Sequence, residues 1–291
     1  MFRLQPEKPV SRELLRTVRD RLDSAIDLIV ENGHLSSEGV HQLRKQFKRL
    51  KALFRLVRTL DDFTGTREIA RYRDLGQELS FSRDRDVMEQ TLVKLQFLTD
   101  DQGVIRRLET LLQRLQNQHA EPTHQHTVID TESLRNKLLD ARAAAEMSLR
   151  GDYSHDALIA GYLETYHKAR KLWKQLPDSR QQEDWHTWRK RVKDDWYQTQ
   201  LLADYRAGGT KKRLARLRQL ADLLGYDHDL QNLSETIEVL SSRTSPADRE
   251  IQNLIDAQRR SLQVACLELG RELYRRKVSF VRKQFSNVKA S

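Results

Sequence analysis

The sequence of 291 residues contains little cysteine, proline or glycine: one, five and eleven residues respectively. The single cysteine, Cys266, excludes an intramolecular disulfide and favours a reducing compartment. So few prolines and glycines argue against an all-β chain, which needs many tight turns. No apolar run approaches the roughly 20 residues that cross a bilayer, and the first residues do not resemble a signal peptide. We therefore expect a cytoplasmic protein with no membrane partner.

Apolar residues recur at helical spacing along almost the whole chain, and no segment shows the alternation typical of a strand. Together with 32% charged residues, this pattern predicts an all-α protein built from amphipathic helices. The expected helices cover about 14–32, 41–60, 66–80, a stretch from 84 onward, 102–118, 133–150, 155–176, 182–206, 211–224, 228–243, 247–270 and 271–286.

A basic motif led by histidine occurs twice, and a shift of 145 positions superposes the two copies. The shift places His41 on His186 and Arg44 on Arg189, and the same register continues without a gap over about 45 residues. It also pairs Arg71 with Arg216. Two homologous halves, and one ligand site built from both, are the simplest interpretation.

The first copy forms a stripe of cations on one face of its predicted helix, at the i, i+3, i+4, i+7 spacing of a helix surface. No acidic residue occurs between His41 and Leu60, although an ordinary solvated helix face mixes signs because like charges repel. A separate apolar seam is expected to enter the core. The stripe consists of His41, Arg44, Lys45, Lys48, Lys51 and Arg55, and the seam of Leu43, Phe47, Leu50, Phe54 and Val57.

The second copy repeats the stripe with His186, Arg189, Lys190 and Lys193, and Trp188, Val192 and Leu202 are expected to face the core. Two carboxylates, Asp194 and Asp195, intrude on this stripe. Trp196 and Gln200 stand where the first copy has Lys51 and Arg55. The second stripe is therefore expected to be the weaker half-site.

The residue types of the stripes suit a chain of phosphates. Arginine makes planar bidentate contacts with phosphate oxygens, lysine supplies a mobile point charge, and a nearby polyanion raises the pKa of histidine. The net charge of +10 and the pI near 9.7 point the same way. The histidines, arginines and lysines of a stripe include no carboxylate pair or nucleophile, so we expect binding and not catalysis, with no cofactor.

Neighbouring elements extend this candidate site. Arg71 and Arg216 border the apolar seam of the helix that follows each stripe, so they can reach toward the same ligand. Arg83 and Asp84 begin the next helix of the first half, where a structural capping role is expected for Asp84 and for its counterpart Asp229.

Three other interpretations compete with this one. The cations can form a solvated face, or they can bind nucleic acid, although the first stripe lacks the interleaved aromatic residues that stack on bases. A metal-dependent phosphohydrolase is suggested by His186, His228 and Asp229. His228 matches Arg83 in the repeat, however, and arginine is no metal ligand.

The longest break between helices contains His119, His124 and His126. Three histidines can bind a metal, but such sites need ligands that are held in place by further partners, and a solvated linker is the simpler interpretation. The predicted division is a first helical repeat over 1–120, a polar linker over 121–132, and a connecting helix with the second repeat over 133–291.

The paired motifs resemble those of the CHAD family, named for a conserved histidine in an α-helical domain. The similar segments are the two His-x-x-Arg motifs, Leu79-Ser80-Phe81-Ser82-Arg83-Asp84, Lys193-Asp194-Asp195-Trp196-Tyr197 and Leu224-Gly225-Tyr226, and the similarity spans roughly 10–286. Trp196 departs from the family pattern, which has arginine there. The resemblance implies two helical bundles related by a pseudo-twofold axis, with a basic central channel that binds inorganic polyphosphate.

Carried onto this chain, the resemblance implies phosphate contacts from both stripes and association with polyphosphate granules, with nucleic acid only as a competing polyanion. The Glu-x-Glu-x-Lys signature of a triphosphate-tunnel domain is absent, so a stand-alone binding module is expected. Arg259 and Arg260 are expected to be exposed and outside the site. The family pattern adds Arg49 to the candidates, so the phosphate contacts implied are His41, Arg44, Lys48, Arg49 and Lys51, then His186, Arg189, Lys190 and Lys193.

Overall fold

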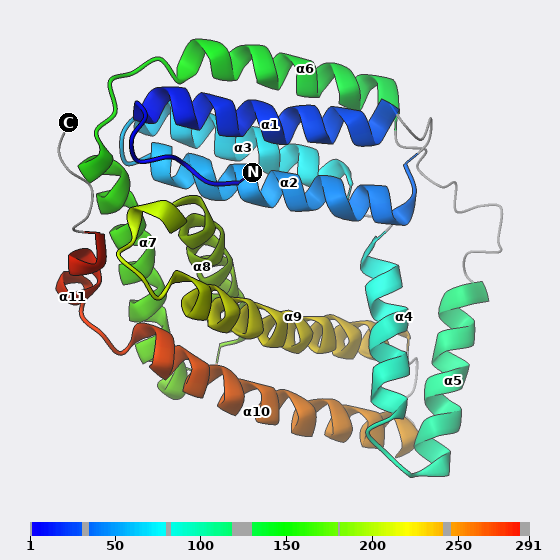
Figure 1. Ribbon diagram of the computed structural model, residues 1–291. Helices are drawn as coiled ribbons and strands as arrows, with labels where there is room; N and C mark the ends of the chain where they lie inside the picture. Colours follow the sequence, from blue (N-terminus) through cyan, green and yellow to red (C-terminus); the bar gives the residue numbers. More distant parts are fainter. Residues whose placement is uncertain are drawn as a thin grey trace. The chain divides into compact units, whose positions relative to one another are not determined.

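A computed structural model describes residues 2–30, 35–79, 83–117, 130–179, 181–240 and 246–285, and within these ranges every regular element is a helix (Figure 1). The all-α prediction is confirmed. The α-helices are α1 (Val10–Val30), α2 (Ser37–Val57), α3 (Asp62–Glu78), α4 (Arg83–Gln96), α5 (Gln102–Asn117), α6 (Thr131–Ser148), α7 (His155–Gln175), α8 (Gln182–Leu201), α9 (Thr210–Leu240), α10 (Pro246–Tyr274) and α11 (Val278–Arg282). Single 3₁₀ turns follow α7, α8 and α11.

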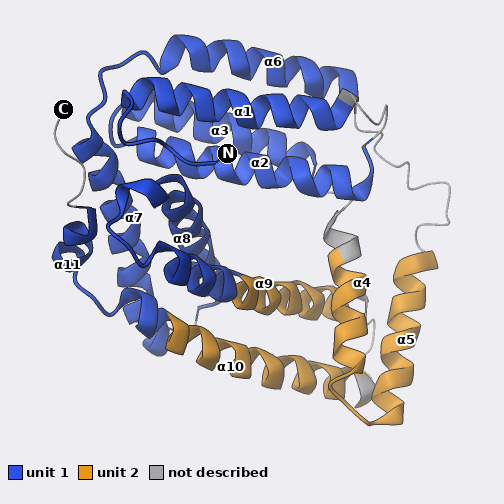
Figure 2. Ribbon diagram, in the orientation of Figure 1, with its two compact units in different colours: residues 1–79, 129–221, 270–291 blue, residues 80–128, 222–269 orange. Residues whose placement is uncertain are grey.

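The chain divides into two compact units, and each takes residues from both halves of the sequence (Figure 2). Unit 1 comprises residues 1–79, 129–221 and 270–291, and unit 2 comprises 80–128 and 222–269. The division falls inside α9 and α10. Both helices that bear the basic motif, α2 and α8, belong to unit 1. The predicted limits at 120 and 132, the first of which falls outside the described residues, and the pseudo-twofold pair of bundles stay predictions.

In unit 1, α2 packs against α1 and α3, and α1 packs against α6 (Figure 1). Helices α7 and α8 pack against each other, and both contact α2. Gly161 of α7 permits this approach, because a Cβ atom there would lie 2.5 Å from Oγ1 of Thr59. Capping side chains fix where several of these helices begin: Ser36 accepts a hydrogen bond from the backbone N–H of Gly39, and Asp61 from that of Thr64.

The apolar seams lie where the periodicity predicts. Every seam residue of α2 is at most 1% exposed, as expected of a helix that is apolar on one side. In the second copy Trp188, Val192 and Leu202 are fully buried. Both predictions are confirmed.

Unit 2 has its own core, formed by leucine, isoleucine and valine side chains of α4, α5, α9 and α10. Arg259 also lies inside this unit and donates from Nε to Asp227 Oδ1 at 3.1 Å. The expectation that Arg259 is exposed is wrong, because a buried carboxylate needs a cationic partner and Asp227 takes it from α10. Arg260 is exposed as expected.

Two predicted helix boundaries are wrong. The expected helices at 211–224 and 228–243 are one helix, α9, which runs through Gly225. A glycine inside a helix costs about 1 kcal/mol, and burial of Leu220, Leu224 and Leu230 outweighs this cost. The expected helices at 247–270 and 271–286 meet differently as well, because α10 continues to Tyr274. In the first half the corresponding break is present, since α3 ends at Glu78 and α4 begins at Arg83.

Candidate functional site

All six basic residues of the α2 stripe, from His41 to Arg55, are half-buried. They lie on the side of the helix that the apolar seam does not occupy. Cations in such positions keep part of their stem in contact with the protein while the charged end reaches solvent or a ligand. The side chains of the stripe therefore pack partly against the protein and are not freely solvated.

Arg44 has a structural task besides any contact with a ligand. Its Nη1 donates to the backbone carbonyls of Gly76 at 3.2 Å and Leu79 at 2.9 Å, at the carboxyl end of α3. The last carbonyls of a helix have no partner within the helix and carry its negative dipole end, so a guanidinium there stabilises α3. Arg44, the second residue of the stripe, thus also fixes the end of the next helix.

Helices α2 and α8 contact each other, and one ion pair at this junction involves Arg55, the last cation of the α2 stripe. Arg55 Nη1 lies 2.5 Å from Oδ1 of Asp194, and the other oxygen of this carboxylate lies 3.1 Å from Nη1 of Arg191. The side-chain amide of Gln198 donates to the carbonyl of Ala52 at 2.9 Å. Asp194 was expected to weaken the second stripe; its observed role is to join that stripe to the first.

Charge crowding at this junction is visible in the ionisation of Lys51. Burial lowers the pKa of Lys51, and the neighbouring cations Arg55, Arg44 and Arg73 lower it further, while Asp194 opposes them. Burial raises the pKa of Asp194, against the pull of its basic partners. One carboxylate therefore serves several cations, and positive charge remains in excess.

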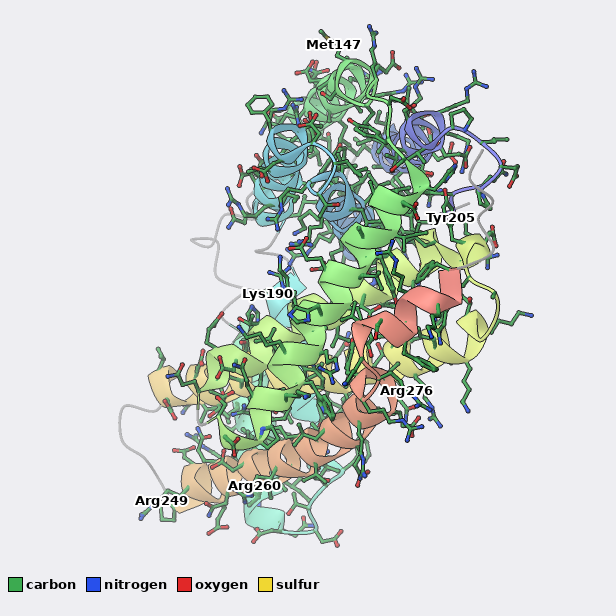
Figure 3. All side chains as sticks on the ribbon, turned by 90° about the vertical axis from the view of Figure 1, so that its left-hand side faces the viewer. Met147, Lys190, Tyr205, Arg249, Arg260 and Arg276 are labelled. Carbon is green, nitrogen blue, oxygen red and sulfur yellow. The ribbon has the colours of Figure 1, made fainter. Side chains whose placement is uncertain are left out.

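The stripe of α8 shows the same crowding. His186, Arg189 and Lys193 are half-buried, whereas Lys190 is exposed and lies 3.8 Å from Glu183 (Figure 3). Burial lowers the pKa of His186, and the charges of Lys190, Arg189 and Lys193 add to this effect while Glu183 opposes it. His186 is thus held toward its neutral form by burial first, and then by the cations that follow it on the helix.

Asp195, the next residue of α8, faces a different set of partners. Its carboxylate accepts hydrogen bonds from Tyr162 at 3.1 Å, Thr199 at 3.0 Å and Tyr274 at 3.0 Å, and Nη2 of Arg213 lies 2.5 Å away. Asp195 is fully buried. A buried carboxylate with this many donors is a structural anchor, here for α7, α9 and α10 around α8.

The other predicted residues whose side chains are described have partners of their own. The guanidinium of Arg49 lies 5.6 Å from the ring centroid of Phe2, and burial lowers its pKa. Arg71 pairs with the buried Glu68 at 3.0 Å, and Arg216 with Glu272 at 3.1 Å. The side chain of Arg83 lies outside the described residues. Phosphate contact by any of these four stays a prediction.

Metal and membrane signals are missing from the part of the chain that the structure describes. No group of three or more histidine, cysteine, aspartate or glutamate side chains there is placed to hold a metal ion. The linker histidines His119, His124 and His126 fall outside that part. None of its helices is both long and apolar enough to cross a membrane.

Comparison with known families supports the resemblance seen in the sequence. The family model of the CHAD domain matches residues 12–238. This chain belongs to the CHAD domain family. The crystal structure of the CHAD domain from the plant Ricinus communis superposes with a TM-score of 0.61 at 15% identity, covering 99% of this chain and 95% of that one. At that identity the likeness concerns the fold. No curated protein sequence matches this CHAD domain.

Sequence reasoning missed one basic region of this CHAD domain. Arg206, Lys212, Arg275 and Arg276 gather with Arg216 around a pocket of unit 1. These residues come from separate segments, so no spacing rule joins them. The runs Lys211-Lys212-Arg213 and Arg275-Arg276-Lys277 were the local signals of a basic surface there.

Proposed function

We propose that this CHAD domain binds inorganic polyphosphate through the cations of α2 and α8 and does not catalyse its cleavage. The observation that carries the proposal is the junction of α2 and α8, the two helices that bear the stripes, where Lys51 and Arg55 of α2 lie beside Asp194 of α8. The histidine stripes are 145 residues apart in sequence, yet they form neighbouring parts of one unit.

The energetics favour an anionic ligand at this junction. Burial lowers the pKa values of Lys51 and His186, and neighbouring cations lower them further; a polyanion would relieve the part that is due to repulsion. Arginine and lysine together suit a linear phosphate chain, because bidentate contacts fix some oxygens and mobile charges follow the rest. Binding would release counterions, so affinity should fall steeply with salt.

The cations of α2 and α8 would also attract a nucleic acid, but these helices offer no stacking surface for its bases. Trp188 is fully buried, and Trp196 stacks on Tyr197 with ring centroids 5.1 Å apart. Sequence-tolerant binding of single strands relies on exposed aromatic rings that stack on bases. We therefore treat nucleic acid as a competing polyanion.

The proposal extends to arrangement and place. The finer arrangement that we propose is a pair of bundles related by a pseudo-twofold axis, with a basic channel for the phosphate chain. We propose a cytoplasmic location with association to polyphosphate granules. The all-helical fold and membership of the CHAD family support this extension.

The decisive experiment titrates polyphosphate of graded length, together with orthophosphate, at several salt concentrations. Lys48 and Lys193 occupy equivalent positions in the two stripes, so the variant Lys48→Gln with Lys193→Gln removes one cation from each. We expect about ten- to hundredfold weaker binding of long chains and a salt slope that is smaller by about 1.4.

The matched control removes two exposed charges of unit 1, in the variant Arg12→Gln with Arg135→Gln. These residues lie on α1 and α6, and they should change the affinity less than about threefold. Equal affinity for orthophosphate and long chains, or equal losses in the two variants, would overturn the proposal. Displacement of bound polyphosphate by an equal concentration of RNA would favour nucleic acid instead.

A further inference from the structure

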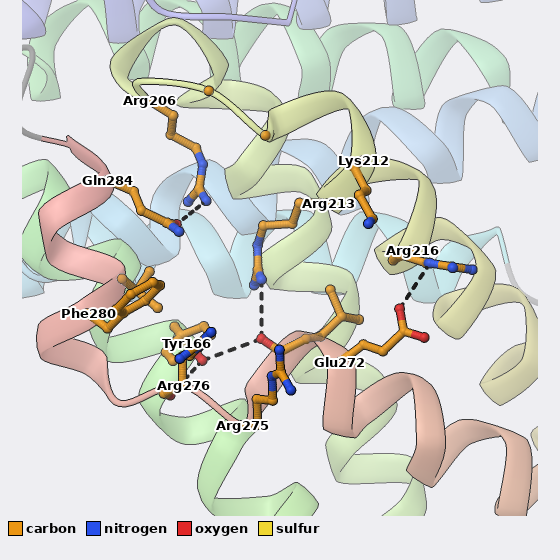
Figure 4. A pocket seen from close by; sticks show the side chains of 14 residues that line it. Tyr166, Arg206, Lys212, Arg213, Arg216, Glu272, Arg275, Arg276, Phe280 and Gln284 are labelled. Carbon is orange, nitrogen blue, oxygen red and sulfur yellow. Dashed lines mark hydrogen bonds and ion pairs between the residues drawn. The ribbon is translucent and has the colours of Figure 1, made fainter.

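A second basic site lies in unit 1 at a pocket that the stripes do not form. The pocket has a volume of about 280 Å³, and six of its lining residues are basic: Arg206, Lys212, Arg213, Arg216, Arg275 and Arg276. Figure 4 shows these side chains arriving from the start of α9, the turn before it and the end of α10. The single acidic residue of the lining is Glu272.

Only part of this positive charge is compensated. Arg216 pairs with Glu272, and Arg213 pairs with Asp195 beneath it. Within the described ranges, no carboxylate lies at ion-pair distance from Lys212, Arg275 or Arg276. The pocket therefore keeps a strong positive excess in a partly enclosed space, where charges interact more strongly than in open solvent.

Not all hydrogen-bond donors of Arg206 have a partner among the described residues. Its Nη2 donates to Gln284 Oε1 at 2.5 Å, but its buried Nε and Nη1 atoms have no hydrogen-bond partner among the residues that the structure describes. Among the residues that the structure describes, no carboxylate lies within ion-pair distance of Arg206, so its charge adds to the positive excess of the pocket. Figure 4 shows the Arg206 and Arg213 guanidinium groups on the same side of the turn.

The turn before α9 adds room for the ligand. Gly208 and Gly209 both have positive φ, 148° and 71°, and both line the pocket. Residues other than glycine rarely adopt that backbone conformation. A Cβ atom at either position would meet nothing within 4 Å. Two exposed glycines thus leave the backbone at the start of α9 accessible to a bound group.

The pocket and the junction of the stripes are held by consecutive residues of α8 with separate partners. Asp194 pairs with Arg55 and Arg191, whereas Asp195 pairs with Arg213. Successive residues of a helix point about 100° apart. Figure 3 shows Lys190 and Arg276 at separate places on the surface. The two basic regions are therefore distinct and can be altered independently.

We infer that this pocket is a second anion site, which binds a compact ligand with two or more linked phosphates, pyrophosphate in its simplest form. The volume lies just below the roughly 300–1,000 Å³ of sites for drug-sized ligands, which favours a small group over a buried chain. A multiply charged ligand is favoured because the six basic residues of the lining outnumber its single acidic residue by five. Phe280, 44% exposed beneath the Arg276 guanidinium, offers an apolar wall as well.

Calorimetric titration of the full chain with pyrophosphate, orthophosphate and ATP tests this inference. Lys212→Gln with Arg276→Gln is the pocket variant, since both side chains are exposed and neither holds an ion pair with a described residue. We expect pyrophosphate affinity to fall about tenfold or more in this variant, with long polyphosphate affected less than threefold. The stripe variant Lys48→Gln with Lys193→Gln should show the reverse.

The ligand arms separate the sources of the phosphates. If ATP binds as tightly as pyrophosphate, the site also accepts nucleotides. If ATP binds more weakly, the site is specific for the free anion. Arg275→Gln provides a second variant with the same expected direction. Unchanged pyrophosphate affinity in both pocket variants, or no saturable binding up to about 1 mM, would overturn the inference. Loss of pyrophosphate binding only in the stripe variant would also overturn the inference of a second site. The proposed binding of polyphosphate by the stripes would then still stand.

Discussion

Helices α2 and α8 carry the same basic motif, yet equivalent positions have different partners. Arg49 and Leu50 of the first copy correspond to Asp194 and Asp195 of the second. Arg49 contacts Phe2 and Leu50 lies in the core, whereas the two aspartates bind arginines of α2 and α9. The first copy therefore supplies most of the cations, and the second supplies the carboxylates that assemble unit 1 around them.

A second contrast concerns a buried charge of opposite sign. Glu68 in α3 is fully buried and lies between Arg67 and Arg71, whereas its counterpart Arg213 in α9 pairs with Asp195. In the first half the buried charge has partners on its own helix, whereas in the second half its partner lies on another helix. At this position the repeat keeps a charge but reverses its sign, as it does between Arg49 and Asp194.

The largest expected effect tests what the copies share. Arg44→Ala with Arg189→Ala should weaken polyphosphate binding by about 3–6 kcal/mol, at about 1.5–3 kcal/mol for each charged hydrogen bond, as measured by titration. Arg260→Ala with Arg249→Ala is the control, because both are exposed, whereas the buried Arg259 is unsuitable. Similar losses in the two pairs would mean that charge acts diffusely. The single variant Arg44→Ala should also lose stability, because it uncaps α3.

The next effect tests where the copies differ. Asp195→Ala leaves Arg213 buried without its carboxylate and should lower the free energy of unfolding by about 3–5 kcal/mol, measured by chemical denaturation. Asp204→Ala removes an exposed partner of Arg3 and should change it by less than about 1 kcal/mol. A small loss for Asp195→Ala would show that the network around it is not an anchor.

The smallest effect concerns the pH dependence of the second stripe. The pKa of His186 in the free protein is lowered, and a bound polyanion should raise it, so binding takes up a proton. The resulting gain in affinity is complete below the pKa of the free protein and is lost as the pH rises through the pKa of the complex. We expect about three- to tenfold tighter binding at pH 5.5 than at pH 8. The variant His186→Gln should show a much flatter profile; an equally steep one would assign the proton elsewhere.

Local patterns were sufficient for the helices and the buried seams. The seam of α2 follows from apolar spacing alone, and so does the burial of Trp188. The continuity of α9 did not follow, because the stability of a helix across Gly225 depends on leucines that pack against other elements. Equally, nothing near Asp227 in sequence indicates that Arg259 is its partner.

The sequence predicted which residues of α2 share a face better than it predicted which residues they contact. The six cations of α2 lie on one half-buried face as the wheel predicts, but Asp194 was taken for a defect of the second stripe. Its role depends on Arg55, which is distant in sequence and adjacent only in the fold. The pocket at Arg206 and Arg276 escaped notice because three chain segments must meet before it exists.

The neighbouring aspartates of α8 have a consequence for how the two halves of the chain depend on each other. If residues 186–220 were replaced by their counterparts 41–75, Arg49 would arrive opposite Arg55, and Leu50 and Glu68 would replace the Asp195 and Arg213 ion pair. Neither segment can substitute for the other, although both carry the same basic motif. The halves have become complementary, so a symmetric dimer of the first half alone would bring like charges together where the present chain brings opposite ones.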